Sequence, residues 1–159
     1  MNILITNALD VKKNLYFDKP YILISITSHG TEHTVPNPLD YNRIATLFIT
    51  FDDCSQKEAD YVSRMIKENP ENYEKNLTLL PLTLEQAHEI WDFIDTYYPL
   101  LTDNILFQCE AGISRSAGCA AGVLQSLGFD NSVCYGPRYY PNIHVKSTMM
   151  HAKRERSKQ

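Results

Sequence analysis

The feature that most constrains the fold of this chain is the alternation of short apolar runs with longer amphipathic segments. Residues 21–27 and 45–51 are short runs rich in β-branched and aromatic side chains, a composition typical of buried strands. The second run stops abruptly at Asp52 and Asp53. Because strands that alternate with helices favour a parallel sheet covered by helices, the sequence predicts an α/β fold with a central, mostly parallel sheet.

Two capping boxes mark the positions where helices should begin. Ser55 and Glu58 form the first box, and Thr83 and Gln86 form the second. The first helix is expected to end at an Asn-Pro pair and the second at about Tyr98. In the second helix apolar residues recur at intervals of three and four, which predicts a buried face made of Leu84, Ala87, Ile90, Trp91, Phe93, Ile94 and Tyr98.

The remainder of the chain fits the same single domain. It is predicted to hold a third strand (105–107), a helix of small residues (117–127) and a last helix that Asn142 caps (142–150). The chain has 159 residues, enough for one domain. We therefore expect one domain over residues 1–152, large enough to hold a catalytic site, and a flexible basic tail over residues 153–159.

Charge and cysteine usage narrow the possible partners and compartment. The net charge of −4 argues against nucleic acid or an anionic membrane as a partner, and no apolar run has the ~18 residues that suggest a membrane span. The four cysteines are widely spaced and include no Cys-x-x-Cys pair, which favours free thiols in a reducing, cytoplasmic compartment. The sequence gives no indication of the oligomeric state.

The segment from His29 to His33 matches the His-x-x-Glu-His pattern of one class of zinc peptidase. That pattern binds zinc only when it lies on a helix. Gly30 and the nearby prolines predict a loop here, so we expect no metal site.

Residues 107–118 carry the strongest chemical signal in the chain. Cys109 stands at the end of an apolar strand, a loop follows, and a helix is expected to begin at Arg115. Loop N–H groups and a helix N-terminus then surround one point, which makes an anion site and favours the thiolate form of a cysteine placed there.

Other residues of this segment fit the same chemistry. Gly112 allows the loop to curl, and the Arg115 guanidinium can bind two oxygens of a phosphate. Ser114 and Ser116 place hydroxyls near the thiol. Spacing of Cys and Arg alone is a weak signal, but the full string in a strand-to-helix context is specific.

With these residues the sequence resembles the cysteine-dependent protein tyrosine phosphatases, in particular the dual-specificity subclass. Cys109 to Ser116 matches the Cys-x5-Arg-Ser/Thr part of that family's signature. The wider similarity runs from the strand at Tyr21 to Leu127, and residues 138–145 are similar to a C-terminal segment of small phage and bacterial relatives.

The resemblance implies a two-step hydrolysis of phosphomonoesters through a phosphocysteine. It makes Cys109 the nucleophile, Arg115 the phosphate clamp and Ser116 the group that stabilises the departing thiolate. It also implies that substrate phosphate binds the loop made of Glu110, Ala111, Gly112, Ile113, Ser114 and Arg115. Neither a metal nor a cofactor is needed, because the loop and the arginine supply the positive field.

The family's general acid is an aspartate after the strand that precedes the long helix, which here means Asp53 or Asp52. Strand alternation favours Asp53, with Asp52 as the alternative. The sequence departs from the family pattern in two places: residues 54–82 look like an insertion, and Gln108 stands where the family has histidine.

The implied substrate is a phosphorylated protein or peptide, with phosphotyrosine favoured over a highly charged lipid headgroup because the loop carries no lysine. Two alternatives remain: a pseudophosphatase that binds phosphorylated partners without turnover, and, with less support, a rhodanese-like sulfurtransferase. Tyr139 and Tyr140 are expected either to line the substrate mouth or to pack on the sheet edge.

Overall fold

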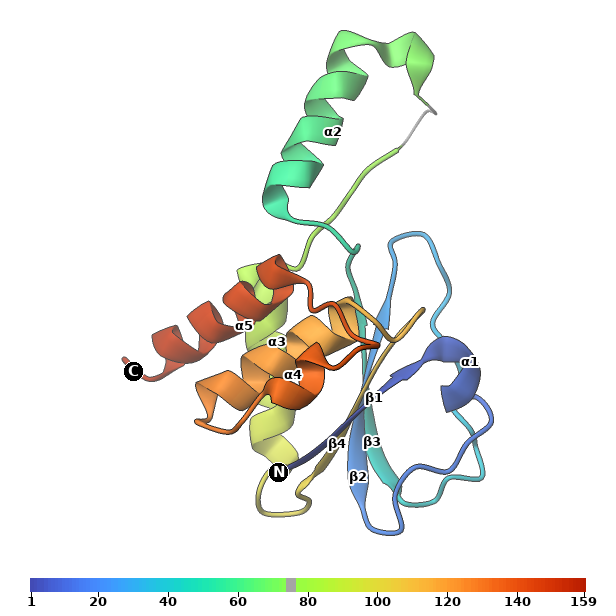
Figure 1. The fold of residues 1–159 in the computed structure, drawn as a ribbon, viewed down its shortest axis with the longest axis vertical. Helices are drawn as coiled ribbons and strands as arrows, with labels where there is room; N and C mark the ends of the chain where they lie inside the picture. Colours follow the sequence, from blue (N-terminus) through green and yellow to red (C-terminus); the bar gives the residue numbers. More distant parts are fainter. Residues whose placement is uncertain (74–76) are drawn as a thin grey trace.

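The computed structural model describes residues 1–73 and 77–159, and a parallel sheet of four strands forms its centre (Figure 1). The strands are β1 (Asn2–Asn7), β2 (Tyr21–Thr27), β3 (Arg43–Thr50) and β4 (Asn104–Cys109). They lie in the order β1-β4-β2-β3, and every neighbouring pair is parallel. The predicted α/β architecture is confirmed, and the sheet gains an N-terminal strand, β1, that the sequence analysis did not predict.

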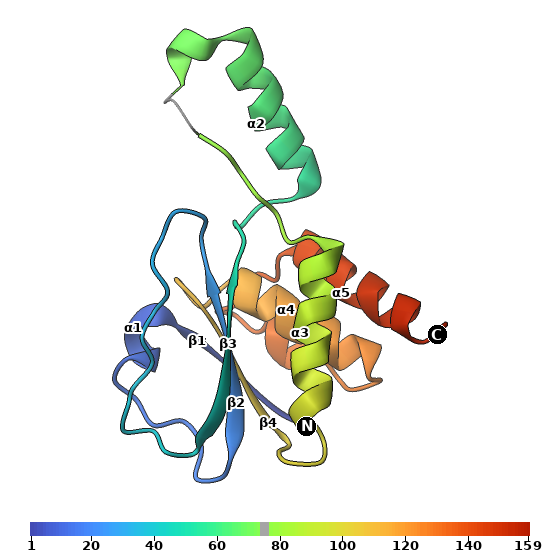
Figure 2. The ribbon, with the colours of Figure 1, turned by 180° about the vertical axis from the view of Figure 1, so that it is seen from behind.

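The helices divide unequally between the two faces of the sheet. They are α1 (Ala8–Val11), α2 (Gln56–Glu68), α3 (Leu84–Tyr97), α4 (Arg115–Ser126) and α5 (Ile143–Arg156), with short 3₁₀ turns at Pro70–Asn72 and Ser132–Tyr135. Figures 1 and 2 show α3, α4 and α5 on one face, and α1 with the long loops on the other. Both predicted capping boxes are present at the starts of α2 and α3. Across the described residues, no helix combines the length and apolar character needed to cross a membrane.

The main core lies between the sheet and its three covering helices. The central strands β2 and β4 are buried along their whole length, as expected for strands covered on both faces. Small residues on α4 bring α5 close: a Cβ on Gly122 would lie 2.7 Å from the Cβ of Met149. This close approach fixes the position of α5 relative to the loop that precedes α4.

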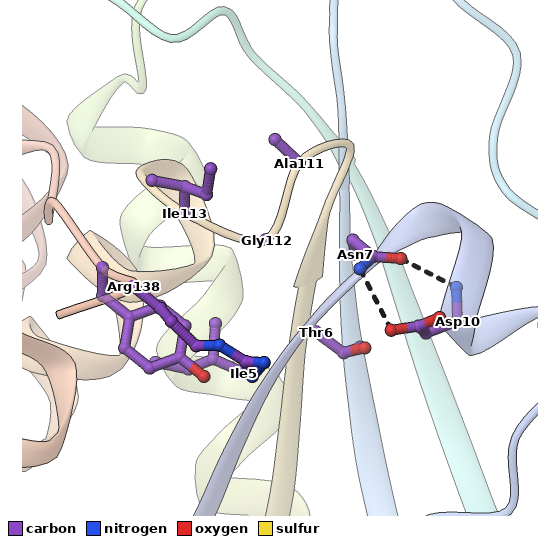
Figure 3. A pocket seen from close by; sticks show the side chains of 9 residues that line it. Ile5, Thr6, Asn7, Asp10, Ala111, Gly112, Ile113 and Arg138 are labelled. Atoms are coloured by element: carbon purple, nitrogen blue, oxygen red, sulfur yellow. Dashed lines mark hydrogen bonds between the residues drawn. The ribbon is translucent and has the colours of Figure 1, made fainter. Parts of the chain in front are cut away.

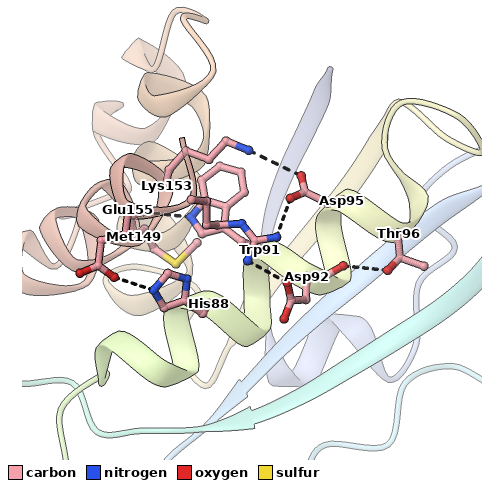
Figure 4. A network of polar contacts seen from close by, with 9 residues as sticks. His88, Trp91, Asp92, Asp95, Thr96, Met149, Lys153 and Glu155 are labelled. Atoms are coloured by element: carbon pink, nitrogen blue, oxygen red, sulfur yellow. Dashed lines mark hydrogen bonds and ion pairs between the residues drawn. The ribbon is translucent and has the colours of Figure 1, made fainter. Parts of the chain in front are cut away.

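Helix α5 continues beyond the predicted end at Met150 and takes in residues 153–156, which the sequence placed in the basic tail. Contacts with α3 explain the extension (Figure 4). The Arg156 guanidinium binds the carboxylates of Asp92 at 2.7 Å and Asp95 at 2.9 Å, and the Lys153 ammonium lies 4.5 Å from the centre of the Trp91 ring. These side chains hold the last turns of the helix against α3.

The segment between β3 and α3 leaves the body of the protein as an arm, defined here as residues 54–73 and 77–79 (Figures 1 and 2). Helix α2 forms its outgoing side, and residues 77–79 lead back to the body. Two hydrogen bonds close its base: Asp52 N–H donates to the Leu80 carbonyl at 2.7 Å, and Leu80 N–H donates to the Asp52 carboxylate at 2.8 Å. The arm therefore starts immediately after the predicted general acid.

Candidate active site

The residues that the sequence assigns to phosphate binding lie in the loop between β4 and α4, apart from Arg115, which begins α4. The loop packs against the turn that follows β1, where Ala8 N–H donates to the Glu110 carbonyl at 3.0 Å. Gly112 has a φ of +67°, and a Cβ there would lie 2.6 Å from the Thr6 carbonyl carbon. Only glycine combines this backbone conformation with so close an approach, so Gly112 sets the curl of the loop.

The predicted nucleophile lies at the base of this loop. Cys109 is the last residue of β4 and is 2% exposed. Its Sγ lies 3.1 Å from the Oγ of Ser116, which is fully buried in the first turn of α4. The hydroxyl can donate to the sulfur, and a thiolate at this position faces the positive end of a 12-residue helix.

Arg115 is buried beside the same loop, with 6% of its surface exposed. Its Nη1 donates to the Oγ of Ser28 at 2.8 Å and to the Phe51 carbonyl at 3.1 Å. These acceptors follow β2 and β3 respectively, so the carboxyl ends of two strands hold the guanidinium. The sequence analysis did not identify Ser28, because nothing in the sequence of that loop pairs it with an arginine so far along the chain.

The two candidate acids have different surroundings. The Asp52 side chain is buried and accepts from the His29 N–H at 2.9 Å and from the Leu80 N–H, so it joins the loop after β2 to the base of the arm. The Asp53 side chain is exposed and its Oδ1 accepts from the Ser114 hydroxyl at 2.8 Å. Asp53 alone of the two therefore contacts the phosphate-binding loop.

Asn142 is a site residue that the sequence analysis treated only as a helix cap. Its Oδ1 accepts from Val145 N–H and caps α5, as predicted, while its Nδ2 donates to Asp53 Oδ1 at 2.8 Å. Its backbone N–H also donates to the Ser114 carbonyl at 3.0 Å. A helix cap uses only the amide oxygen of asparagine. The amide nitrogen of Asn142 is therefore free for a second contact, and this was the only hint of it in the sequence.

Gln108, at the position where the signature that the sequence resembles has a histidine, is buried and neutral. Its Oε1 accepts from the Ser25 hydroxyl at 2.5 Å, and this pair links β4 to β2 beneath the loop. Gln108 therefore brings a hydrogen-bonding amide, and no titrating ring, next to the thiol.

A cavity of about 330 Å³ lies beside the loop and is lined by Ala111 to Ile113 and by the end of β1 (Figure 3). Arg138 and Tyr139 form one of its walls, and Asn7 and Asp10 lie on the other side. Tyr140, in contrast, is 74% exposed. Of the two tyrosines, the structure thus packs Tyr139 beside the loop and leaves Tyr140 in solvent.

All four cysteines are free and buried. Burial raises the pKa of Cys54 to about 11, with the nearby Asp52 carboxylate adding to the effect, and burial alone raises the pKa of Cys134 to about 11. The thiols of Cys54 and Cys134 therefore stay protonated at neutral pH. Among the described residues, His29 and His33 included, no three His, Cys, Asp or Glu side chains are grouped so that they could hold a metal ion.

Comparisons with known proteins give matches in structure. No family model matches the sequence, and no curated protein matches it significantly. The human tyrosine phosphatase-like serine/threonine/tyrosine-interacting protein superposes with a TM-score of 0.60 at 12% identity, over 98% of this chain and 93% of that one. A mouse candidate dual specificity phosphatase, solved with zinc tungstate, superposes with a TM-score of 0.53 at 12% identity, over 99% of this chain and 85% of that one. The chain thus has the fold of the dual-specificity phosphatases.

Proposed function

We propose that this protein is a metal-independent phosphomonoester hydrolase that works through a phosphocysteine at Cys109. One observation carries the proposal, which is the grouping of four side chains at one loop. The Cys109 thiol, the Ser116 hydroxyl and the buried Arg115 guanidinium lie at the loop itself. The Asp53 carboxyl contacts the loop from the segment that follows β3. This arrangement contains a nucleophile, an anion clamp and a proton donor, which are the groups that phosphoryl transfer needs.

In the first step the Cys109 thiolate attacks phosphorus and the S–P bond forms as the P–O bond to the leaving group breaks. The loop N–H groups and Arg115 bind the equatorial oxygens. Nη1 of Arg115 is held by Ser28 and Phe51, and the other N–H groups of the guanidinium are then directed to the phosphate. The leaving oxygen takes its proton from Asp53. Because Oδ1 accepts from Ser114 and Asn142, we assign the proton to Oδ2.

In the second step water attacks phosphorus and the S–P bond breaks, which releases inorganic phosphate. The Asp53 carboxylate takes the proton of the attacking water. The Ser116 hydroxyl, 3.1 Å from Sγ, donates a hydrogen bond to the thiolate as it leaves. Both steps use groups that the chain itself provides, and the enzyme returns to its starting state.

We propose phosphotyrosine in proteins or peptides as the substrate, with phosphoserine and phosphothreonine as further possibilities. The exposed loop residues are Glu110, Ala111 and Ile113, which give no cationic surround for a polyphosphorylated headgroup. The free cysteines and the phosphoprotein substrate favour a cytoplasmic, reducing location. Tungstate, present in the mouse neighbour's crystals, is a tetrahedral oxyanion like phosphate, which supports oxyanion chemistry on this fold.

The direct test is hydrolysis of p-nitrophenyl phosphate between pH 5 and 8 without added metal. We expect turnover that vanadate inhibits and that Cys109→Ser abolishes. Turnover that survives in Cys109→Ser would refute the phosphocysteine mechanism. Chelator in the assay buffer controls for contaminating metal-dependent phosphatases.

A second candidate function is the binding of phosphorylated partners without turnover. Two observations favour it: Gln108 stands in place of the histidine, and the human neighbour is named as a phosphatase-like interacting protein. The intact Cys109, Arg115 and Asp53 favour the enzyme. Failure to hydrolyse any phosphomonoester, together with tight binding of a phosphotyrosine peptide, would select the binding function. The sulfurtransferase alternative has no further support, because both neighbours carry phosphatase-type names.

A further inference from the structure

A second concave surface lies at the base of the arm, next to the candidate active site. This arm-base cavity has a volume of about 520 Å³. Its wall is mostly apolar and is contributed by the segment before α2, by α2 itself and by the returning side of the arm. The apolar positions are Cys54, Tyr61, Val62 and Leu79, and the polar positions are Asp53, Lys57 and Glu58. The mechanism uses none of these residues except Asp53.

The arm-base cavity adjoins the candidate active site at one residue. Asp53 lines the cavity, and the same side chain accepts from Ser114 in the phosphate-binding loop. With Asp53 as the proposed acid, a phosphoresidue bound in the loop would place its leaving oxygen at Asp53, and the atoms that follow that oxygen would pass beside the arm-base cavity. A substrate that extends beyond its phosphorylated residue would meet this surface.

The side chains on this surface are available for contact. Tyr61 is 55% exposed although it is aromatic, and the Arg64 guanidinium lies 5.5 Å from the centre of its ring. Val62 and Leu79 are half-buried. A cavity wall of aromatic and aliphatic groups with a few polar positions is typical of a site for an apolar side chain.

On the basis of the proposed function, we propose that the arm-base cavity binds an apolar side chain that flanks the phosphorylated residue of a protein substrate. A polypeptide is favoured over a phosphorylated lipid by the local charges. Asp53, Glu58 and the nearby loop residue Glu110 oppose an anionic bilayer, and they outnumber Lys57 in the cavity wall and Arg64, which stacks on Tyr61 beside it. The arm is thus a substrate-recognition element attached directly to the general acid.

The test compares phosphotyrosine peptides that carry either leucine or serine at one of four positions, two before and two after the phosphotyrosine. For the full chain we expect kcat/KM to be about tenfold higher with leucine at one or more of these positions, as for an apolar group entering a fitted pocket. In Tyr61→Ser and Leu79→Ser the leucine-to-serine ratio should fall to about two or less. Tyr41→Ser is the matched control, because Tyr41 is 85% exposed and lies outside the cavity. It should keep the ratio.

Each outcome has a defined meaning. If the chain does not turn over p-nitrophenyl phosphate, the proposed function fails, and the same leucine-to-serine ratio is read from peptide Kd values by fluorescence anisotropy. A ratio near one at all four positions, or a ratio that both cavity variants retain, overturns the inference while leaving the hydrolase intact. Preference for a short-chain phosphoinositide over every peptide overturns it too. A dimer in sedimentation analysis that Tyr61→Ser dissociates would assign the cavity to a second copy of the chain.

Discussion

Asp52 and Asp53 are neighbours in sequence, yet each has its own task. Asp52 is buried and accepts two backbone N–H groups, from His29 and Leu80, whereas Asp53 is exposed and contacts Ser114 and Asn142. Both residues follow the end of β3, and successive side chains of an extended chain point to opposite sides. One carboxylate therefore stabilises the base of the arm, and the other is presented to the loop.

For Asp53→Asn we expect a loss of activity that depends on the leaving group. An amide cannot supply a proton, so kcat for phenyl phosphate should fall about 100-fold, and kcat for p-nitrophenyl phosphate, whose leaving group needs less help, should fall much less. Steady-state kinetics with the two esters measure the difference. Equal losses with both esters would argue against Asp53 as the acid.

Asp52→Asn gives the opposite pattern. An amide oxygen keeps less of the charge-assisted bonding to the two N–H groups, so the free energy of unfolding should fall by about 1–3 kcal/mol. The ratio of kcat between the two esters should stay as in the original chain. Urea unfolding and the same kinetic pair measure both quantities. A leaving-group effect in this variant would move the acid role to Asp52.

At the scale of elements, the contact between α4 and the start of α5 positions Asp53, the proposed acid. A Cβ on Gly118 would lie 2.6 Å from the Asn142 carbonyl oxygen, so this glycine allows Asn142 to reach Asp53. In Gly118→Ala the start of α5 must shift, and we expect kcat for phenyl phosphate to fall about tenfold or more, with a loss of stability of about 1–3 kcal/mol. Gly136→Ala is the control, because the nearest atom to its Cβ would be 3.8 Å away. Unchanged kinetics in Gly118→Ala would show that the Asn142–Asp53 contact is dispensable.

The length of α5 gives a second prediction at this scale. Removing residues 151–159 deletes the buried Ala152 and the contacts of Lys153 and Arg156 with α3, so we expect unfolding free energy to fall by about 2 kcal/mol. Removing only residues 157–159 should change it by less than about 0.5 kcal/mol. Thermal or urea unfolding compares the two truncations. Equal stability of both would mean that residues 151–156 act as a flexible tail.

The sequence predicted those elements that carry a strong local signal. The capping boxes of α2 and α3 and the apolar runs of β2 and β3 depend on adjacent residues, and the structure contains all four elements. Strand β1 was missed because four of its six residues are polar or exposed and its partner, β4, is about a hundred residues away along the chain. Helix α5 was predicted too short because the groups that extend it, Asp92 and Asp95, belong to α3.

The same distinction holds for the candidate site. The Cys109–Ser116 segment is contiguous, so its pattern could be read from the sequence, and the structure places these residues around one loop. Ser28 and Asn142 reach the site through tertiary contacts, at Arg115 and Asp53. Their roles become visible only when the carboxyl ends of the strands are brought together.

For the whole molecule, we expect stability to decrease at alkaline pH. The pKa of Cys54 and that of Cys134 are raised from 9.0 to about 11 by burial. Between about pH 9 and 11 the unfolded chain releases these protons while the folded chain retains them, so the stabilisation is complete below pH 9 and is lost as the pH rises through this window. Thermal unfolding at pH 7, 9 and 10 measures the slope. The slope should be smaller in Cys54→Ala, and an unchanged slope would contradict a role for this thiol.

The strand order β1-β4-β2-β3 has a consequence for the chain as it emerges during synthesis. The first and second strands are separated in the sheet by a place that only residues 104–109 can fill. Until β4 has been made, β1 lacks its partner in the sheet, and β2 can pair only with β3. The strand that arrives last to complete the sheet is also the strand that ends in Cys109. A chain that stops before residue 104 therefore lacks both the complete sheet and Cys109, and the candidate nucleophile takes its place only once β4 has been made.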